Sequence, residues 1–213
     1  MFVGHLAVAL AAKPIAPTIS LGALIAAAFG LDLIWPLFVL TGLEEVRVQP
    51  GATAFTPLSF VSYPWSHSLL MSVVWGLAFG AARSRWSRDT VVIAAVVVSH
   101  WVLDFITHQP DLPLWIEGPR VGLGLWNSIP ATLIVEGALF LAGVIAYARF
   151  TRSRSSTGNW ALTGLLTLCT LIWISGPFSA PPPSAEAVAV VALAMWLFPL
   201  WGFWIERNRV PRR

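Results

Sequence analysis

Residues 89–108 of this 213-residue chain read DTVVIAAVVVSHWVLDFITH. A helix of 20 residues is about 30 Å long, which matches the hydrocarbon thickness of a bilayer, and this stretch is apolar along most of its length. Three ionisable side chains interrupt its second half: His100, Asp104 and His108. The stretch therefore predicts a membrane-spanning helix that carries a polar site.

The composition of the whole chain supports the same environment. Hydrophobic residues make up 57% and charged residues 11% of the sequence, against about a quarter charged in soluble domains. The mean hydropathy is +0.75. A pI near 9.8 could suggest nucleic-acid binding, but the arginines lie in short clusters between apolar runs, which is typical of membrane topology. Cys169 is the single cysteine, so neither an internal disulfide nor a multi-cysteine metal site can form.

Hydropathy predicts an all-α, polytopic transmembrane bundle of six spans, each near the length that crosses a bilayer. The predicted spans are 18–42 with a bend at Pro36, 63–82, 89–108, 127–149, 159–178 and 185–205. A short hydrophobic helix over 1–12 precedes them and should end at Pro14 and Pro17. A cleaved signal peptide is the alternative for this stretch, although no basic leader precedes its apolar core. We expect one integral membrane domain, 1–213, with a motif-bearing part (1–110), additional spans (127–205) and a short cytoplasmic tail (206–213).

The basic residues predict the orientation of the bundle, because Lys and Arg are retained on the cytoplasmic side. Only two basic residues, Arg47 and Arg120, lie in the loops 43–62, 109–126 and 179–184. The other eleven basic residues fall on the opposite side: Lys13, Arg83, Arg85, Arg88, Arg149, Arg152, Arg154, Arg207, Arg209, Arg212 and Arg213. We therefore expect a cytoplasmic C-terminus. Tryptophans near the span ends, such as Trp65, Trp86, Trp115, Trp126 and Trp201, are interpreted as interfacial anchors.

Ionisable side chains within membrane spans are costly and are functional-site candidates by default. The candidates here are His5, Asp32, His67, His100, Asp104, His108 and Glu136. The predicted topology places five of them toward the outer leaflet: Asp32, His67, His100, Asp104 and His108. His5 joins them if the first helix crosses with its N-terminus outside. The inert alternatives are hydrogen bonding within the bundle for His100 and Asp104, and an interfacial position for His5 and His67. Glu136 is expected to be a structural partner for Arg120 or a hydroxyl.

The spacing within 89–108 favours one metal-binding pair. Residues four apart lie on one face of a helix, about 6 Å apart along the axis, whereas His100 and His108 are about 12 Å apart and cannot share one ion. His100 and Asp104 are therefore the preferred pair, with His108 nearer the external water. Imidazole and carboxylate ligands suit Zn²⁺ or a similar divalent cation.

Four sequence elements together resemble the LexA-regulated, membrane-bound metal-dependent hydrolase family of bacteria: Gly4-His5, the segment around Asp32, Trp65-Ser66-His67-Ser68, and Ser99 through His108. The resemblance covers roughly 1–110 and implies a multi-helix inner-membrane protein with metal-dependent hydrolase activity. Members of that family often carry Asp-x-Asp in the second element. Here Asp32 is followed by Leu33 and Ile34, so a single-ion site is the simpler expectation.

The sequence thus predicts a metal-dependent hydrolase whose site opens near the outer leaflet and whose substrate is a lipid or another amphipathic molecule. His5, His67, His100 and Asp104 are the expected metal ligands, and Asp32 and His108 are the expected catalytic residues, Asp32 as a further ligand or general base and His108 as a proton shuttle. The expected partners are membrane lipid and the metal ion, with no nucleic acid and no obligate protein partner. The alternative is a non-enzymatic ion or proton transporter, or a membrane binding protein, that uses the same residues.

Overall fold

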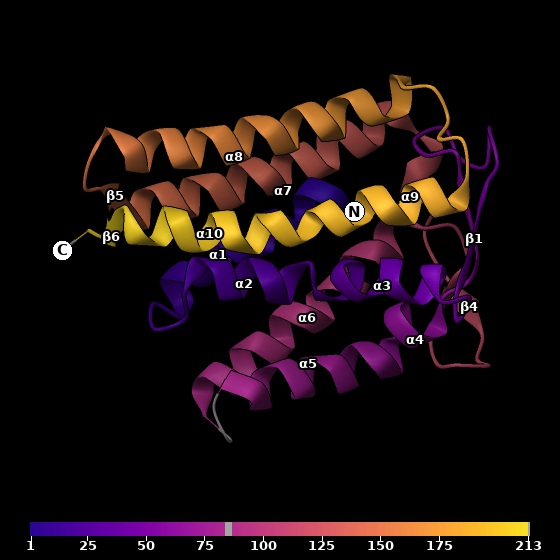
Figure 1. Cartoon of the computed structure of the whole chain (residues 1–213), viewed down its shortest axis with the longest axis horizontal. Coiled ribbons are helices and arrows are strands. Elements are labelled where there is room, and N and C mark those ends of the chain that lie inside the picture. The colour runs from indigo at the N-terminus through magenta and orange to yellow at the C-terminus, as the bar shows by residue number, and fades with distance from the viewer. Residues whose placement is uncertain (84–86, 213) are drawn as a thin grey trace.

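The computed structural model of the chain describes residues 1–83 and 87–212 and is mostly helical (Figure 1). Arg85, Trp86 and Arg213, which entered the predicted topology, lie outside the described residues. The helices are α1 (Phe2–Ile15), α2 (Leu21–Ala28), α3 (Gly30–Leu40), α4 (Pro64–His67), α5 (Leu69–Arg83), α6 (Arg88–Thr107), α7 (Ile129–Phe150), α8 (Ser156–Ser175), α9 (Ala185–Ala192) and α10 (Leu197–Arg207). Short 3₁₀ turns are η1 (Leu125–Asn127), η2 (Gly176–Phe178) and η3 (Leu193–Trp196).

Four helical segments among the described residues are long and apolar enough to cross a membrane: Arg88–Thr107, Ile129–Phe150, Ser156–Phe178 and Ala185–Arg207. They coincide with four of the six predicted spans. The pair α2 and α3 raises the number to five if the two helices form one bent span. The predicted span 63–82 is instead broken at Ser68, whose extended backbone ends α4 and whose hydroxyl caps α5. The count of six spans is therefore not confirmed.

The bend in the first predicted span lies at Phe29, between α2 and α3, and not at Pro36 as expected. The two helices meet at 52°, while Pro36 lies inside α3. The break leaves the carbonyl oxygen of Ala28 free to accept a hydrogen bond from His100 on α6. A contact that is distant in sequence therefore compensates for the interrupted helix.

Helix α1 lies in the interior of the bundle, where it packs against α7, α2 and α6. Gly143 of α7 permits the close approach, because a Cβ atom at this position would lie 2.5 Å from the carbonyl oxygen of Ala7. The helix continues through Pro14 to Ile15, beyond the predicted end at Ala12. Lys13 stabilises this last turn by donating hydrogen bonds to the carbonyls of Pro17 and Ile19 and to Glu206.

Three antiparallel strand pairs close the two ends of the bundle: β1 (Glu45–Val48) with β2 (Leu58–Ser62), β3 (Leu112–Pro113) with β4 (Arg120–Val121), and β5 (Thr151–Ser153) with β6 (Arg209–Pro211). In Figure 1, β1 and β4 lie at one end and β5, β6 and the C-terminus at the other. The loops that contain β1 and β4 thus lie at the end opposite the basic C-terminal segment, as the distribution of basic residues predicts. The expected tail 206–213 is ordered where β6 pairs with β5.

Candidate metal centre

The centre of the site is formed by His100 and Asp104, which lie one turn apart on α6. The Nε2 atom of His100 lies 3.1 Å from Oδ2 of Asp104, and both side chains are buried. The predicted pairing of these two residues is therefore present. His108 follows the last residue of α6 and does not belong to this pair.

The protonation of His100 is fixed by the break in the α2–α3 segment. Its Nδ1 atom lies 2.8 Å from the carbonyl oxygen of Ala28, and a carbonyl can only accept, so Nδ1 carries the proton. In the neutral ring, Nε2 then has a lone pair directed toward the carboxylates. No hydrogen bond of acceptable geometry reaches this buried Nε2 atom. Such an atom is well suited to bind a metal ion.

His67 reaches the cluster from α4 and is oriented by two residues outside it. The hydroxyl of Ser66 donates a hydrogen bond to Glu44 at 2.7 Å and lies 2.6 Å from Nδ1 of His67. Because the single hydroxyl proton is used on Glu44, Nδ1 of His67 is the donor to Ser66, and Nε2 is left with a lone pair. This Nε2 lies 3.4 Å from Oδ1 of Asp32 and 3.9 Å from Oδ2 of Asp104.

Glu44 supports the candidate site through Ser66, and the sequence interpretation missed it because it stands in a polar loop. Its carboxylate accepts a second hydrogen bond from the backbone nitrogen of Ser66 at 2.8 Å, and the residue is only 3% exposed. Burial raises the pKa of the Glu44 carboxyl, and its hydrogen bonds with Ser66 oppose this shift. The polar element Trp65-Ser66-His67 was the available signal, but it did not reveal the acceptor for the serine.

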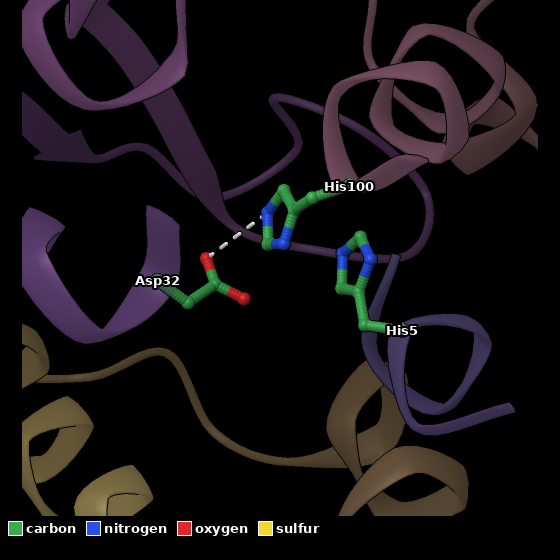
Figure 2. A group of neighbouring side chains, drawn as sticks. All are labelled: His5, Asp32 and His100. Atoms are coloured by element: carbon green, nitrogen blue, oxygen red, sulfur yellow. Dashed lines mark ion pairs between the residues drawn. The ribbon is translucent and has the colours of Figure 1, made fainter. Parts of the chain in front are cut away.

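Asp32 and His5 complete the cluster from α3 and α1. Asp32 lies in the first turn of α3, where the helix dipole favours a negative charge, and its Oδ1 atom is 3.7 Å from Nε2 of His100. Figure 2 shows these two side chains together with His5. The His5 and His100 rings are stacked, with centroids 3.6 Å apart, and Nε2 of His5 is 3.2 Å from Oδ1 of Asp104.

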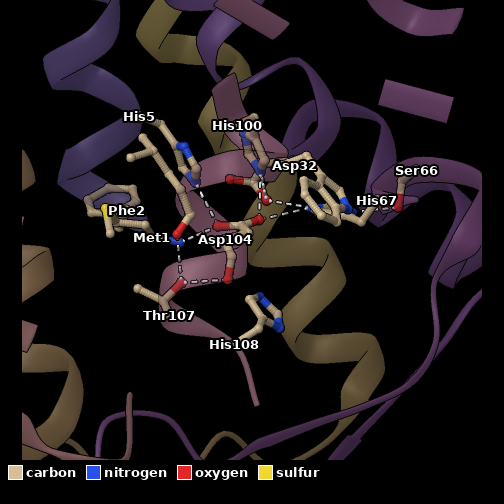
Figure 3. Close-up of polar contacts among 12 residues, drawn as sticks. Met1, Phe2, His5, Asp32, Ser66, His67, His100, Asp104, Thr107 and His108 are labelled. Carbon is tan, nitrogen blue, oxygen red and sulfur yellow. Dashed lines mark hydrogen bonds and ion pairs between the residues drawn. The ribbon is translucent and has the colours of Figure 1, made fainter. Parts of the chain in front are cut away.

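The ligand atoms fit a divalent cation. Two sets, His67 with His100 and Asp104, and His5 with Asp32 and His100, each offer atoms within 4.8 Å of one another. Two ligands on a tetrahedral ion with bonds of about 2.1 Å lie about 3.4 Å apart, close to the separations found here. The two carboxylate oxygens of Asp104 have different partners. Oδ1 accepts a hydrogen bond from the nitrogen of Met1, and Oδ2 faces His100 and His67 (Figure 3).

His108 lies beside the cluster and belongs to a separate polar group. Its Nδ1 atom is 3.0 Å from Asp111 and 3.1 Å from the hydroxyl of Tyr63, which donates to Asp111. Burial and the neighbouring Asp111 carboxylate raise the pKa of the Tyr63 hydroxyl well above its ordinary value, so Tyr63 keeps its proton at neutral pH. His108 thus lies outside the two groups of side chains that could hold a metal ion.

A cavity of about 170 Å³ adjoins the cluster. Asp32, His67, Asp104 and His108 contribute the ionisable side chains of its wall. The remaining wall is mainly apolar: Met1, Phe2, Trp35, Leu58, Phe60, Trp126, Ala192 and Met195. A small polar group can therefore reach the carboxylates and imidazoles from one side.

The prediction that Glu136 pairs with Arg120 or with a hydroxyl was wrong. Its Oε2 atom accepts a hydrogen bond from the backbone nitrogen of Phe2 at 3.1 Å, and within residues 1–83 and 87–212 neither Arg120 nor a hydroxyl is paired with it. The first turn of α1 is buried, so its free amide needs an acceptor that water cannot supply. Glu136 is thus a side chain of α7 that anchors the helix carrying His5.

Comparison of the chain with protein-family models, with curated proteins and with solved structures finds no match.

Proposed function

We propose that the chain is a membrane-embedded metal-dependent hydrolase that acts on a lipid or another amphipathic substrate. The observation that carries this proposal is the arrangement of His67 and His100. Both rings have their Nδ1 protons engaged outside the cluster, and both direct Nε2 toward buried or half-buried carboxylate oxygens. A lone pair facing an anion is unfavourable unless a proton or a metal ion lies between them, and the convergence of several imidazoles and carboxylates suits a metal ion. Zn²⁺ is the cation that this donor set suits best.

The residues of the cluster have separate roles in the proposed hydrolysis. A bound divalent cation would polarise a water molecule or the oxygen of an ester, amide or phosphoester. His67, His100 and Asp104 hold the cation, and His5 completes the ligand set. Asp32, which is half-buried at the cavity wall, binds the ion or takes the proton of the attacking water, and His108 returns a proton to the leaving group.

The membrane setting is part of the proposal. The basic residues favour a cytoplasmic C-terminus, and α4, which ends at His67, lies near β1 and β4 at the end of the bundle opposite the C-terminus (Figure 1). The site would then lie in the outer half of a bacterial inner membrane. The resemblance of 1–110 to the LexA-regulated, membrane-bound hydrolases supports the same location and reaction class.

A proton or ion transporter would need polar groups that continue across the bundle. Along α1, His5 and Lys13 are separated by about 12 Å of helical rise. The intervening residues include Leu6 and Leu10, which are at most 1% exposed and apolar. Lys13 is already held by Glu206 at 2.7 Å. This apolar layer favours a one-sided site over a relay.

The test is hydrolysis in heavy-oxygen water. Zinc-loaded protein is incubated with a total extract of bacterial membrane lipids, and mass spectrometry searches for products that contain the heavy oxygen. We expect labelled products with the wild type and a loss of about 100-fold or more with Asp32→Asn, since general acid–base residues contribute at this level. The thermal midpoint should change little.

Glu117→Gln is the matched control, because Glu117 is exposed and lies outside the cluster. It should retain the wild-type rate. Absence of labelled product from lipids and from simple ester, amide and phosphoester substrates would contradict the hydrolase. An Asp32→Asn protein with full metal content and full turnover would remove Asp32 from the site.

A further inference from the structure

A large cavity lies against the flank formed by α8 and the α9–α10 segment, which run along the same side of the bundle in Figure 1. Its volume is about 570 Å³, within the range of sites that hold one small organic molecule. Nearly all of its wall is apolar, and Thr56 contributes the single polar side chain. The catalytic residues proposed above do not line it.

Four residues line both this apolar cavity and the smaller cavity beside the metal centre: Phe2, Leu58, Ala192 and Met195. The two spaces are therefore neighbours that share one wall. A path from the polar cluster into the apolar cavity passes from charged to purely hydrocarbon surroundings. This change in polarity matches an amphipathic molecule with one polar end.

We propose that the apolar cavity binds the hydrocarbon chain of the substrate while the polar group of the same molecule lies at the His/Asp cluster. This inference rests on the proposed function and specifies its substrate as a membrane amphiphile with a chain next to the bond that is cleaved. The cavity opens on the lipid-facing side, where Val191 is 72% and Leu197 59% exposed. A chain can therefore enter from the bilayer without passing through water.

The length of the cavity gives the inference a measurable consequence. Ala192 stands at the shared wall, and Trp201 lines the cavity nine residues further along the same span, which corresponds to about 13 Å of helix. Each buried methylene contributes about 0.8 kcal/mol, which is about a fourfold gain in affinity. Affinity should thus rise with chain length and then level off when the cavity is full.

The experiment uses alkylphosphonates of about four to about twelve carbons as non-hydrolysable probes, chosen so that each methylene adds a measurable step. Their binding to the zinc-loaded, full-length protein is measured in detergent solution by native mass spectrometry. We expect a gain of about fourfold per methylene for the shorter probes. Leu168→Trp adds bulk near the Trp201 end of the cavity, because Leu168 lines the cavity one helical turn from Gly164, which adjoins Trp201. It should abolish the gain for the longer probes only. An affinity that does not depend on chain length would overturn the inference.

Leu171→Trp is the matched control, because Leu171 lies on the same helix, is 62% exposed and does not line the cavity. Equal chain-length profiles for the two tryptophan variants would also contradict the inference. Ala192→Phe offers a second variant, which should reduce every long probe to the affinity of a short one, with Val190→Phe as its control. Comparable thermal midpoints for each pair exclude a folding defect as the cause.

A second set of probes separates this inference from the proposed function. Linear alcohols of the same lengths lack a metal-binding group, so they test the cavity in the metal-free protein. Chain-length dependence with the alcohols, but no effect of zinc on the phosphonates, would support the apolar cavity and contradict the metal centre. A zinc-dependent gain that is independent of chain length would support the metal centre and overturn the chain-binding cavity.

Discussion

At the scale of single residues, the site depends on where two histidine protons are held. His100 uses a backbone carbonyl for this purpose, and His67 uses Ser66 and Glu44. Partners of this kind commonly orient metal-binding histidines and raise their basicity. The residues that hold the ligands are therefore as informative about the site as the ligands themselves.

Glu44→Gln should weaken metal binding without unfolding the protein. A glutamine that still accepts from the backbone nitrogen of Ser66 must direct its amide NH₂ toward the hydroxyl of Ser66. The hydroxyl proton then turns to Nδ1 of His67, and the ring must carry its own proton on Nε2, the ligand atom. We expect a loss of about 10- to 100-fold in zinc affinity, measured by competition with a chelator.

Glu45→Gln is the control, since Glu45 is exposed and pairs with Arg47 at 2.7 Å. Its zinc affinity should equal that of the wild type. Unchanged zinc affinity in Glu44→Gln, with a lowered thermal midpoint, would show that Glu44 is only a structural acceptor.

The sequence predicted the residues of the cluster better than the residues that support them. His5, Asp32, His67, His100 and Asp104 stand out because an ionisable group in an apolar run is rare and costly. Glu44 gives no such signal, because acids are common in loops. The donor to Glu136, the backbone N–H of Phe2, was also missed, since a backbone amide leaves no trace in the sequence.

At the scale of elements, four long apolar helices could be predicted, but the interrupted ones could not. Pro36 suggested a bend that lies instead at Phe29, and the span 63–82 divides at Ser68. Both breaks lie next to residues of the cluster: Asp32 lies in the first turn of α3, and His67 ends α4. The breaks are stabilised by contacts between distant segments, such as His100 with Ala28, which hydropathy and local propensity do not contain.

The packing of α1 on α7 should be sensitive to the size of residue 143. Gly143→Val places carbon where the backbone of Ala7 lies, so the helix that carries His5 must move. Small residues at such interfaces allow helices to approach closely in membranes. We expect a destabilisation of at least about 1–3 kcal/mol, as in other overpacked interiors, seen as a lower thermal midpoint and reduced zinc retention.

Gly137→Val on the same helix is the control for this substitution. A Cβ atom there would meet only the edge of the Trp173 side chain, at 3.2 Å, and a side chain can adjust. Its midpoint should fall by less. Equal effects of the two substitutions would mean that the close contact between α1 and α7 does not hold His5 in place.

At the scale of the whole molecule, four helices that are separate in the sequence contribute side chains to one cluster: α1, α3, α4 and α6. The sequence could suggest convergence only through the shared depth of the residues. Their mutual distances depend on the two breaks and on the buried position of α1. The orientation in the membrane is a further property of the whole molecule, and it stays a prediction.

Eleven basic residues lie on one side of the predicted bundle and two on the other, which predicts which end of the bundle faces the cytoplasm. A reporter fused after Arg213 should be active in the cytoplasm, and one inserted near Gly118 should be active in the periplasm. Alkaline phosphatase and a fluorescent protein report the two compartments in opposite ways, so each fusion serves as the control for the other. A cytoplasmic position for Gly118 would invert the orientation and move the cluster to the inner leaflet.

The central claim is that the cluster binds a divalent cation, and metal analysis of the purified protein tests it most directly. Wild-type protein and a variant with His100→Ala and Asp104→Ala are compared by mass spectrometry of the metals, with His108→Ala as a control outside the ligand set. We predict about one zinc or similar ion per wild-type chain, the same content in the control, and loss of the ion in the double variant. Equal metal content in the wild type and the double variant, or none in either after zinc loading, would contradict the account.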